Sequence, residues 1–359
     1  MKNRDYDISE KRREQYRQSS KESAAAKQNA LTSNEMPYRS VNHPRLDPKS
    51  LMPKLPKNSL RTLSLFSGGG GLDLGFDRAG YDHVASYDFI PVCGDTLKHN
   101  RPDWTVHSGA DVGDVRNLSV DEYTDLVDVI HGGPPCQPFS TSGQGAGIDD
   151  SRNMWGPFVD IINHVKPRAF IGENVPGLLN TKFSSYVQQY ILSPLSDYHI
   201  HAFKLNSAGF GVPQKRQRVF FVGFRSKADA DAFKIPEYTH DFEHLLTRNR
   251  KNYNEQQPSL WGEKRQCFGI REALGFPDIG KDALCPTIRS AFTGKRNTTS
   301  ILNSSAAARS LAEIEVWGSG VAANRALASS FRPKNGHYRL SVQDCALLQG
   351  FPESWEFQG

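Results

Sequence analysis

A strand-like run that leads into four glycines and the start of a helix constrains the fold of this chain more than any other feature. Thr62–Phe66 is typical of a β-strand, Gly68–Gly71 follows it closely, and an apolar helical start comes at Leu72–Phe76. Glycines at such a turn let a ligand approach the backbone at the carboxyl edge of a sheet. The turn is not a Walker loop, since no Gly-Lys-Ser or Gly-Lys-Thr follows, and it fits Gly-x-Gly-x-x-Gly in no frame.

An acidic residue at the end of the next strand indicates what this pocket could hold. His83–Tyr87 is the predicted strand, and Asp88 follows Gly71 by 17 positions. An α/β fold places a carboxylate for ribose hydroxyls at such a strand end. Phe89 beside it could cover the face of an adenine. We therefore expect a nucleoside cofactor without a demanding polyphosphate, with a tight turn that holds no ligand as the alternative.

Further strand-like segments alternate with helical spacing as far as residue 223. The predicted strands are Leu126–Ile130, Arg168–Gly172 and Val219–Gly223, and Phe158–Val165 carries apolar residues at helical spacing. This alternation predicts an α/β domain with a largely parallel sheet. Residues 224–337 break the rhythm because they are polar and rich in predicted loops, and regular structure is expected again at Tyr338–Ser341.

Composition and charge limit the class of protein. The 359 residues can build a sizeable core and more than one domain, and 37% hydrophobic with 23% charged residues fits a soluble globular protein. No apolar run approaches membrane-spanning length, and no apolar export signal follows the basic N-terminus. Residues 1–58 hold 13 Lys and Arg against 7 Asp and Glu, whereas the whole chain carries +5. We expect this basic extension to be disordered, and any nucleic-acid surface elsewhere to be a local patch.

The five cysteines indicate the compartment. They are odd in number, widely spaced and contain no Cys-x-x-Cys pair. This argues against a disulfide framework and against a cysteine zinc site, so no metal is expected. The sequence thus favours a reducing compartment, the cytoplasm.

One cysteine lies in a stiff turn that suits a nucleophile. Cys136 follows Pro134-Pro135, which cannot continue a central strand, directly after the strand-like run that ends near Gly132. A thiol at a strand end on a rigid backbone can be aimed at a substrate. The alternative is a buried structural cysteine, the commonest fate of a free cysteine.

Two other polar groups are expected at the same edge of the sheet. Glu173 and Asn174 follow the Arg168–Gly172 strand, and a carboxyl group beside a closed pocket can act as an acid. Arg216 and Arg218 alternate just before a strand, where they could hold an anion, polarise a carbonyl or lower a thiol pKa. Taken alone, the carboxylate could be an ordinary strand-end group, and the arginines a solvated charge run.

Five blocks of sequence occur in a fixed order, and together they resemble the motifs of one known protein family. They are Phe66-Ser67-Gly68-Gly69-Gly70-Gly71-Leu72-Asp73, Gly133-Pro134-Pro135-Cys136-Gln137-Pro138-Phe139-Ser140, Glu173-Asn174-Val175, Gln214-Lys215-Arg216-Gln217-Arg218 and Leu348-Gln349-Gly350-Phe351-Pro352. The chain resembles the DNA cytosine-C5 methyltransferases of bacterial restriction–modification systems over residues 61–225 and 338–357. The resemblance implies a Rossmann-like S-adenosylmethionine-dependent domain together with a smaller, loop-rich target-recognition domain.

The resemblance also implies residue roles. Cys136 would add to C6 of a flipped-out cytosine, so that C5 can attack an electrophilic methyl group. Glu173 would assist protonation at N3, Asn174 would support the base-binding turn, and Arg216 and Arg218 would polarise O2. S-adenosylmethionine would contact a set of residues at the sheet edge, namely Phe66, Gly68, Gly70, Gly71, Leu72, Asp88, Phe89, Asp111, Val112 and Pro135.

The domain plan implied by the resemblance has four parts. Residues 1–58 form the extension, 59–223 the catalytic and cofactor-binding domain, 224–337 the target-recognition domain, and 338–359 a return segment to the catalytic domain. The implied partner is double-stranded DNA, and a cognate restriction endonuclease belongs to the same system. Candidate DNA contacts are Gln137, Ser140, Arg289, Lys295 and Arg296.

The chain departs from the family pattern in two ways. Position 88 is Asp where Glu is more usual and position 89 is Phe where Trp is common, and both changes preserve the chemistry. Relatives continue past Gln349–Pro352 into an Asn-Ala-Val-Pro-Pro-type segment, whereas this sequence stops at Gly359. We therefore expect a monomer that is truncated or completed by a second chain. The alternatives are an RNA cytosine-C5 methyltransferase and a DNA-binding protein that is inactive without that segment.

Overall fold

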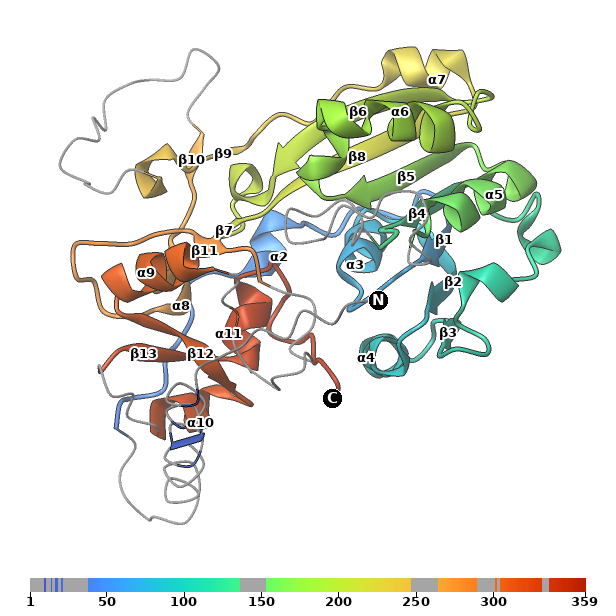
Figure 1. Cartoon of the computed structure of the whole chain (residues 1–359). Coiled ribbons are helices and arrows are strands. Elements are labelled where there is room, and N and C mark those ends of the chain that lie inside the picture. The colour runs from blue at the N-terminus through green and yellow to red at the C-terminus, as the bar shows by residue number, and fades with distance from the viewer. Residues whose placement is uncertain are drawn as a thin grey trace.

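The computed structural model describes residues 10, 14, 17–18, 21, 38–135, 153–246, 264–288, 301, 304–330 and 336–359. Figure 1 shows a larger part built on a sheet and a smaller part beside it, with the N-terminal α2 lying between them. The larger part contains β1 Arg61–Leu65, α3 Gly71–Arg78, β2 Asp82–Asp88, α4 Pro91–Asn100, β3 Val106–Ser108, β4 Val129–Gly132, α5 Trp155–Val165, β5 Ala169–Asn174, α6 Ser184–Val187, β6 His199–Asn206, β8 Gln217–Phe224 and α7 Lys227–Ala232. Short 3₁₀ turns within it include Pro176–Leu179 and Ser207–Phe210.

The sheet has seven strands in the order β3-β2-β1-β4-β5-β8-β6. The first five are parallel, and β8 runs antiparallel to both β5 and β6. The predicted α/β fold with a largely parallel sheet is therefore confirmed. The sequence did not indicate β6, since its side chains are mostly exposed or half-buried at the edge of the sheet.

Helix α5 packs on the sheet through a stripe of apolar residues. Its buried positions are Trp155, Phe158, Val159, Ile161, Ile162 and Val165, which recur at the spacing of one helical face. Trp155 meets Phe221 of β8 at a ring-centroid distance of 5.3 Å and an interplanar angle of 77°. This edge-to-face packing joins α5 to the antiparallel part of the sheet, so both parts share one core.

The smaller part has its own hydrophobic core. Its elements, with the strands that join it to the larger part, are β7 Gln214–Lys215, β9 His240–Asp241, β10 Arg265–Gln266, α8 Ile270–Leu274, β11 Cys285–Pro286, α9 Ser305–Glu313, β12 Val316–Ala322, α10 Arg325–Ser330, β13 Tyr338–Ser341 and α11 Val342–Leu347. Strand β13 pairs with β12, and Leu340 and Leu347 are buried in the same cluster as Ile270. The boundary predicted at residue 338 therefore crosses this core, and the chain returns to the larger part only after α11.

Residues 38–58, which lie directly before β1, are ordered, whereas the disordered extension was predicted to reach residue 58. It contains α2 Pro48–Leu51, which Asp47 caps by accepting a hydrogen bond from the Lys49 backbone N–H at 3.0 Å. Leu46 is buried in the core of the smaller part. The sequence did not indicate this order, because the contacts that fix the segment lie far away along the chain. Within the described ranges, no helix is long and apolar enough to span a membrane.

Candidate active site

The glycine turn lies where β1 and β2 end side by side. The Ser67 backbone N–H donates to the Tyr87 carbonyl at 3.1 Å, and the Gly68 N–H donates to Asp88 Oδ2 at 2.8 Å. The other oxygen of Asp88 accepts from the Ile90 N–H at 2.8 Å. Asp88 thus fixes the glycine turn directly, and with a further hydrogen bond to the Cys93 thiol its two oxygens still have room for another donor.

The glycines of the turn do not have one common purpose. A Cβ built at Gly68, which has a φ of 55°, would meet no atom within 4 Å. At Gly70, with a φ of 83°, it would stand 2.6 Å from Leu97 Cδ2 and 2.7 Å from Trp355 Cζ2. At Gly71 it would stand 3.3 Å from Phe351 Cζ. Gly68 therefore faces open space, whereas Gly70 and Gly71 make room for aromatic side chains near the end of the chain.

Those aromatic residues were not among the sequence candidates. Trp355 donates from Nε1 to the Gly69 carbonyl at 3.1 Å and is 4% exposed. Phe357 lies 4.9 Å from Phe351, centroid to centroid, and both pack beside Trp355 against Leu74 and Leu97. The signal in the sequence is three aromatic residues within seven positions, but it does not reveal their partner.

Exposed apolar side chains flank Asp88 at the same edge. Phe89 is 53% exposed and Val112 is 59% exposed, and Ile90 next to Phe89 is 52% exposed, so several apolar side chains gather in solvent near Asp88. The loop that carries Asp111 and Val112 is held to the end of β2, because the Gly109 N–H donates to the Asp88 carbonyl at 3.1 Å. Phe66 and Leu72 are half-buried on either side of the turn. These residues fit an aromatic ring with a polar sugar.

The layer under the turn holds buried titratable groups. Burial raises the pKa of Asp73, in the first turn of α3, to about 6. Its Oδ1 accepts a hydrogen bond from Ser86 Oγ at 2.9 Å, and that hydroxyl lies 2.6 Å from His83 Nε2. Burial lowers the pKa of His83 to about 4 and that of His131 to about 3, so both rings are neutral near pH 7.

Antiparallel pairing brings Glu173 and two arginines together. β5 ends at the edge where β8 begins, and Asn174 pairs with Val219 across them. Arg218 Nε lies 2.8 Å from Glu173 Oε1, and Arg216 Nη2 lies 3.5 Å from the same atom. The Glu173 side chain is 22% exposed, so the pairs are only partly screened by solvent. The carboxylate is held in place by two guanidinium groups that also face the edge of the sheet.

The turn that leads to Cys136 is fixed on the same group of residues. Asn174 Nδ2 donates to the Pro134 carbonyl at 3.1 Å, while Asn174 Oδ1 accepts from the Val175 N–H at 2.9 Å. A Cβ at Gly133 would stand 3.2 Å from Glu173 Oε2, so glycine permits this close approach. Pro135 is exposed. The chain therefore passes Glu173 three residues before Cys136.

Several sequence candidates lie outside the described residues. They are Cys136, Gln137, Ser140, Arg289, Lys295 and Arg296. The four described cysteines make poor nucleophiles, because burial raises the pKa of Cys93, Cys267 and Cys285 to about 12 and that of Cys345 well above its usual value. In the described ranges, no group of three or more His, Cys, Asp and Glu could hold a metal ion.

Comparison with known proteins identifies the family. Residues 60–359 match the sequence profile described as C-5 cytosine-specific DNA methylase. This chain belongs to that family. The methylase is 31% identical over 309 residues to the Type II methyltransferase M.NgoMIV of Neisseria gonorrhoeae, covering 83% of this chain and 88% of the relative. It is 28% identical over 316 residues to the Type II methyltransferase M.FnuDI of Fusobacterium nucleatum, covering 83% and 86%.

A solved structure supports the fold of the methylase. The crystal structure of a prophage-encoded DNA modification methyltransferase of E. coli aligns with a TM-score of 0.50 at 24% identity, covering 83% of this chain and 90% of that one. The family and the enzyme class predicted from the five motif blocks are thus confirmed. The roles of individual residues stay predictions, as does the division of the chain into four parts.

Proposed function

We propose that this methylase transfers a methyl group from S-adenosylmethionine to C5 of a cytosine in double-stranded DNA, through a transient bond between Cys136 and C6. The observation that carries the proposal is the meeting of Glu173 with Arg216 and Arg218, beside the turn that ends two residues before Cys136. A carboxyl group, two fixed cations and an adjacent thiol are the groups that this chemistry needs.

The chain's own residues would supply the nucleophile, the acid and the groups that stabilise developing charge. The Cys136 thiolate bonds to C6 while a ring electron pair moves toward C5, and Glu173 assists proton transfer at N3. Arg216 and Arg218 stabilise the charge that develops at O2. C5 would take the methyl group as the bond between that methyl and the donor's sulfonium sulfur breaks and leaves a thioether. A solvent water would then accept the C5 proton, and the bond between the Cys136 sulfur and C6 would break to restore the thiolate. Asn174 keeps the Cys136 turn in position through the Pro134 carbonyl.

The edge around Asp88 fits the cofactor that family members use. S-adenosylmethionine supplies an electrophilic methyl group when it is bound. The open space at Gly68 would admit the cofactor beside Phe66, Gly70, Gly71 and Leu72, whose aromatic and backbone surfaces border the turn. Asp88 would accept from the ribose hydroxyls, and exposed Phe89 and Val112 would cover the adenine beside Asp111. Pro135 would border the methyl group, since it directly precedes Cys136.

The smaller part is proposed to read the DNA sequence. Gln137, Ser140, Arg289, Lys295 and Arg296 are the proposed DNA contacts, because their side chains suit phosphates and base edges. A base must leave the helix to reach a buried site, so a separate surface is needed to read its neighbours. The likeness to Type II methyltransferases supports a protective role, in which methylation at one short site blocks a partner endonuclease.

The first test is methyl transfer by the chain itself. We expect label from S-adenosylmethionine to enter duplex DNA, and one particular pre-methylated site to block it. Incorporation into RNA but not DNA would refute the substrate, and transfer at unrelated cytosines would refute sequence specificity.

A second test addresses the covalent step. Duplex DNA that contains 5-fluorocytosine at the target should form an adduct that survives denaturation, since fluorine cannot leave C5 as a proton does. Cys136→Ala should abolish both adduct and transfer while keeping DNA binding. Cys93→Ser is the matched control, because that thiol is half-buried with a raised pKa and a hydroxyl can keep its hydrogen bond to Asp88. Transfer by Cys136→Ala would exclude the proposed nucleophile.

A further inference from the structure

Residues 38–58 connect the two parts of the molecule but lie outside the region that matches the family, which begins at residue 60. We call this segment the brace. Its first half contacts the smaller part, its second half contacts the larger part, and α2 lies between the two, as the blue helix in Figure 1 shows.

The first half of the brace binds the smaller part through backbone, stacking and burial. The N–H groups of Arg45 and Leu46 both donate to the Ala273 carbonyl at the end of α8, at 3.0 and 3.2 Å. The Leu46 side chain is 7% exposed and lies in the hydrophobic core. The Arg39 guanidinium stacks on the Tyr338 ring of β13, with 3.7 Å between its Cζ and the ring centroid. The first half of the brace is thus integral to the smaller part.

The second half of the brace is hydrogen-bonded to the larger part at the end of α3. The Leu55 N–H donates to the Arg78 carbonyl at 2.7 Å, and the Arg78 guanidinium donates to the Met52 carbonyl. The Asn58 N–H donates to the Gly80 carbonyl at 3.0 Å, and a side chain at Gly80, which has a φ of 87°, would clash with the Pro56 carbonyl. This end of the brace is therefore fixed to the helix that follows the glycine turn.

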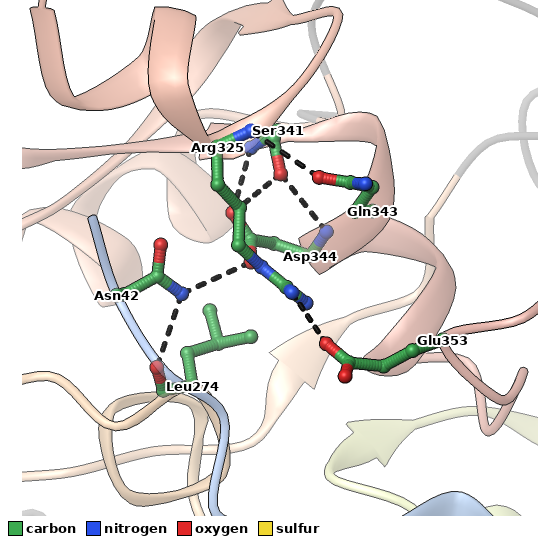
Figure 2. Close-up of polar contacts among 7 residues, drawn as sticks. All are labelled: Asn42, Leu274, Arg325, Ser341, Gln343, Asp344 and Glu353. Carbon is green, nitrogen blue, oxygen red and sulfur yellow. Dashed lines mark hydrogen bonds and ion pairs between the residues drawn. The ribbon is translucent and has the colours of Figure 1, made fainter.

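Asn42 links the brace to a buried ionic cluster. Its Nδ2 donates to the Leu274 carbonyl at 3.0 Å and to Asp344 Oδ1 at 3.1 Å. Asp344 is fully buried, pairs with Arg325 Nε at 2.8 Å, and accepts at Oδ2 from the N–H and hydroxyl of Ser341. Figure 2 shows these side chains converging from the brace, α10 and α11.

The cluster continues toward the glycine turn. Arg325 also pairs with Glu353, which stands two residues before the Trp355 that donates to the Gly69 carbonyl. The same carboxylate of Asp344 thus anchors α11, α10 and the brace. A pocket of about 430 Å³ beside it is walled by Asn42 and Pro44 on one side and Arg325 on the other. Loss of the Asn42 amide would leave a buried carboxylate with one donor fewer and loosen the brace.

We propose that the brace holds the smaller part at the orientation needed to bind duplex DNA, with Asn42 and Arg39 as positioning residues. This rests on the DNA-methylating function proposed above. Duplex DNA needs both parts at once, whereas the cofactor needs only the sheet edge. The contacts of Asn42 and Arg39 described above are to the smaller part, so loss of either side chain should lower DNA affinity and leave cofactor affinity unchanged.

The experiment uses the full chain and three single variants. Asn42→Ala and Arg39→Ala should each raise the Kd and KM for duplex DNA roughly tenfold, since each removes a contact to a charged or aromatic group. The Kd for S-adenosylmethionine should stay within about twofold. Lys54→Ala, an exposed position on the same segment, is the control and should change neither value.

Hydrogen exchange makes the result decisive. Faster exchange of the Arg45 and Leu46 amides reports that the brace has detached from Ala273. Detachment with unchanged DNA affinity in either variant would overturn the proposal. A parallel loss of DNA and cofactor affinity with a lower Tm would overturn it also, because that pattern marks general destabilisation. DNA binding measured by fluorescence anisotropy needs no methyl transfer, so a failed covalent mechanism leaves this test intact.

Discussion

Alanine at Gly68 and at Gly70 separates a glycine that faces a ligand from one that makes room for packing. Both residues have positive φ, 55° and 83°, so each substitution carries a similar backbone strain of about 1–2 kcal/mol. At Gly70 the new Cβ would also stand within 2.7 Å of Leu97 and Trp355, and such overpacking adds about 1–3 kcal/mol. Gly70→Ala should therefore lower the free energy of unfolding by about 2–5 kcal/mol, against about 1–2 kcal/mol for Gly68→Ala.

Cofactor affinity should fall more in Gly68→Ala than in Gly70→Ala, the reverse of their order in lost stability, when both variants are measured in the folded state. The methyl group of Gly68→Ala projects into the space that we assign to S-adenosylmethionine, and we expect its affinity to fall by at least about tenfold. Urea unfolding without cofactor and titration calorimetry at a temperature where both variants are folded supply the two numbers. Gly75→Ala, in α3 with no atom within 4 Å, is the control and should be neutral or slightly stabilising. Equal stability losses at Gly68 and Gly70, or unchanged cofactor affinity in Gly68→Ala, would refute the reasoning.

Three further substitutions test the site and the layer beneath it. Glu173→Gln keeps the shape of the side chain but removes the charge that faces Arg216 and Arg218, so kcat should fall by about 10²- to 10⁴-fold with cofactor affinity unchanged; a kcat within tenfold of wild type would contradict the acid role. Asp88→Ala removes two backbone hydrogen bonds and should weaken cofactor binding roughly tenfold while kcat at saturation holds, and an unaltered Kd would contradict the ribose assignment. Burial lowers the pKa of His131 to about 3, whereas its pKa in the unfolded state is about 6.5. Below pH 6.5 the unfolded state therefore binds a proton that the folded state does not bind, and about 2 kcal/mol of stability is lost by pH 5. His131→Phe, which keeps a ring against Phe76, should remove that share of the acid sensitivity in urea unfolding; an identical pH dependence would argue against it.

Local features of the sequence predicted the local structure well. Thr62–Phe66 and the glycines after it became β1 and α3 with a shift of about one residue, because strand propensity, the turn and the helix start act within a few positions. Strand β6 was missed since it lies at the edge of the sheet, where only one of its eight residues is buried. The order of the antiparallel β8 in the sheet is likewise a property of the whole fold.

The sequence predicted that Glu173 lies at the carboxyl edge of the sheet, but it did not predict the geometry of its contacts. Glu173 and the two arginines lie more than 40 positions apart, and they meet only because β8 starts at the edge where β5 ends. The glycines of the turn also show that the sequence alone did not reveal their packing partners. The resemblance implied cofactor contacts at Gly68, Gly70 and Gly71. The structure adds that Gly70 and Gly71 make room for Trp355 and Phe351, whose positions no local pattern connects to the turn.

The core of the smaller part has a consequence for engineering. It is assembled from three stretches of chain, since Leu46 precedes the sheet and Leu340, Leu347 and Leu348 follow the predicted boundary at residue 338. Grafting residues 224–337 from a relative would leave these side chains from the original protein. The core would then have to pack from side chains of two different proteins. A chimera designed to change the methylated site should therefore transplant residues 38–51 and 338–348 together with the insert.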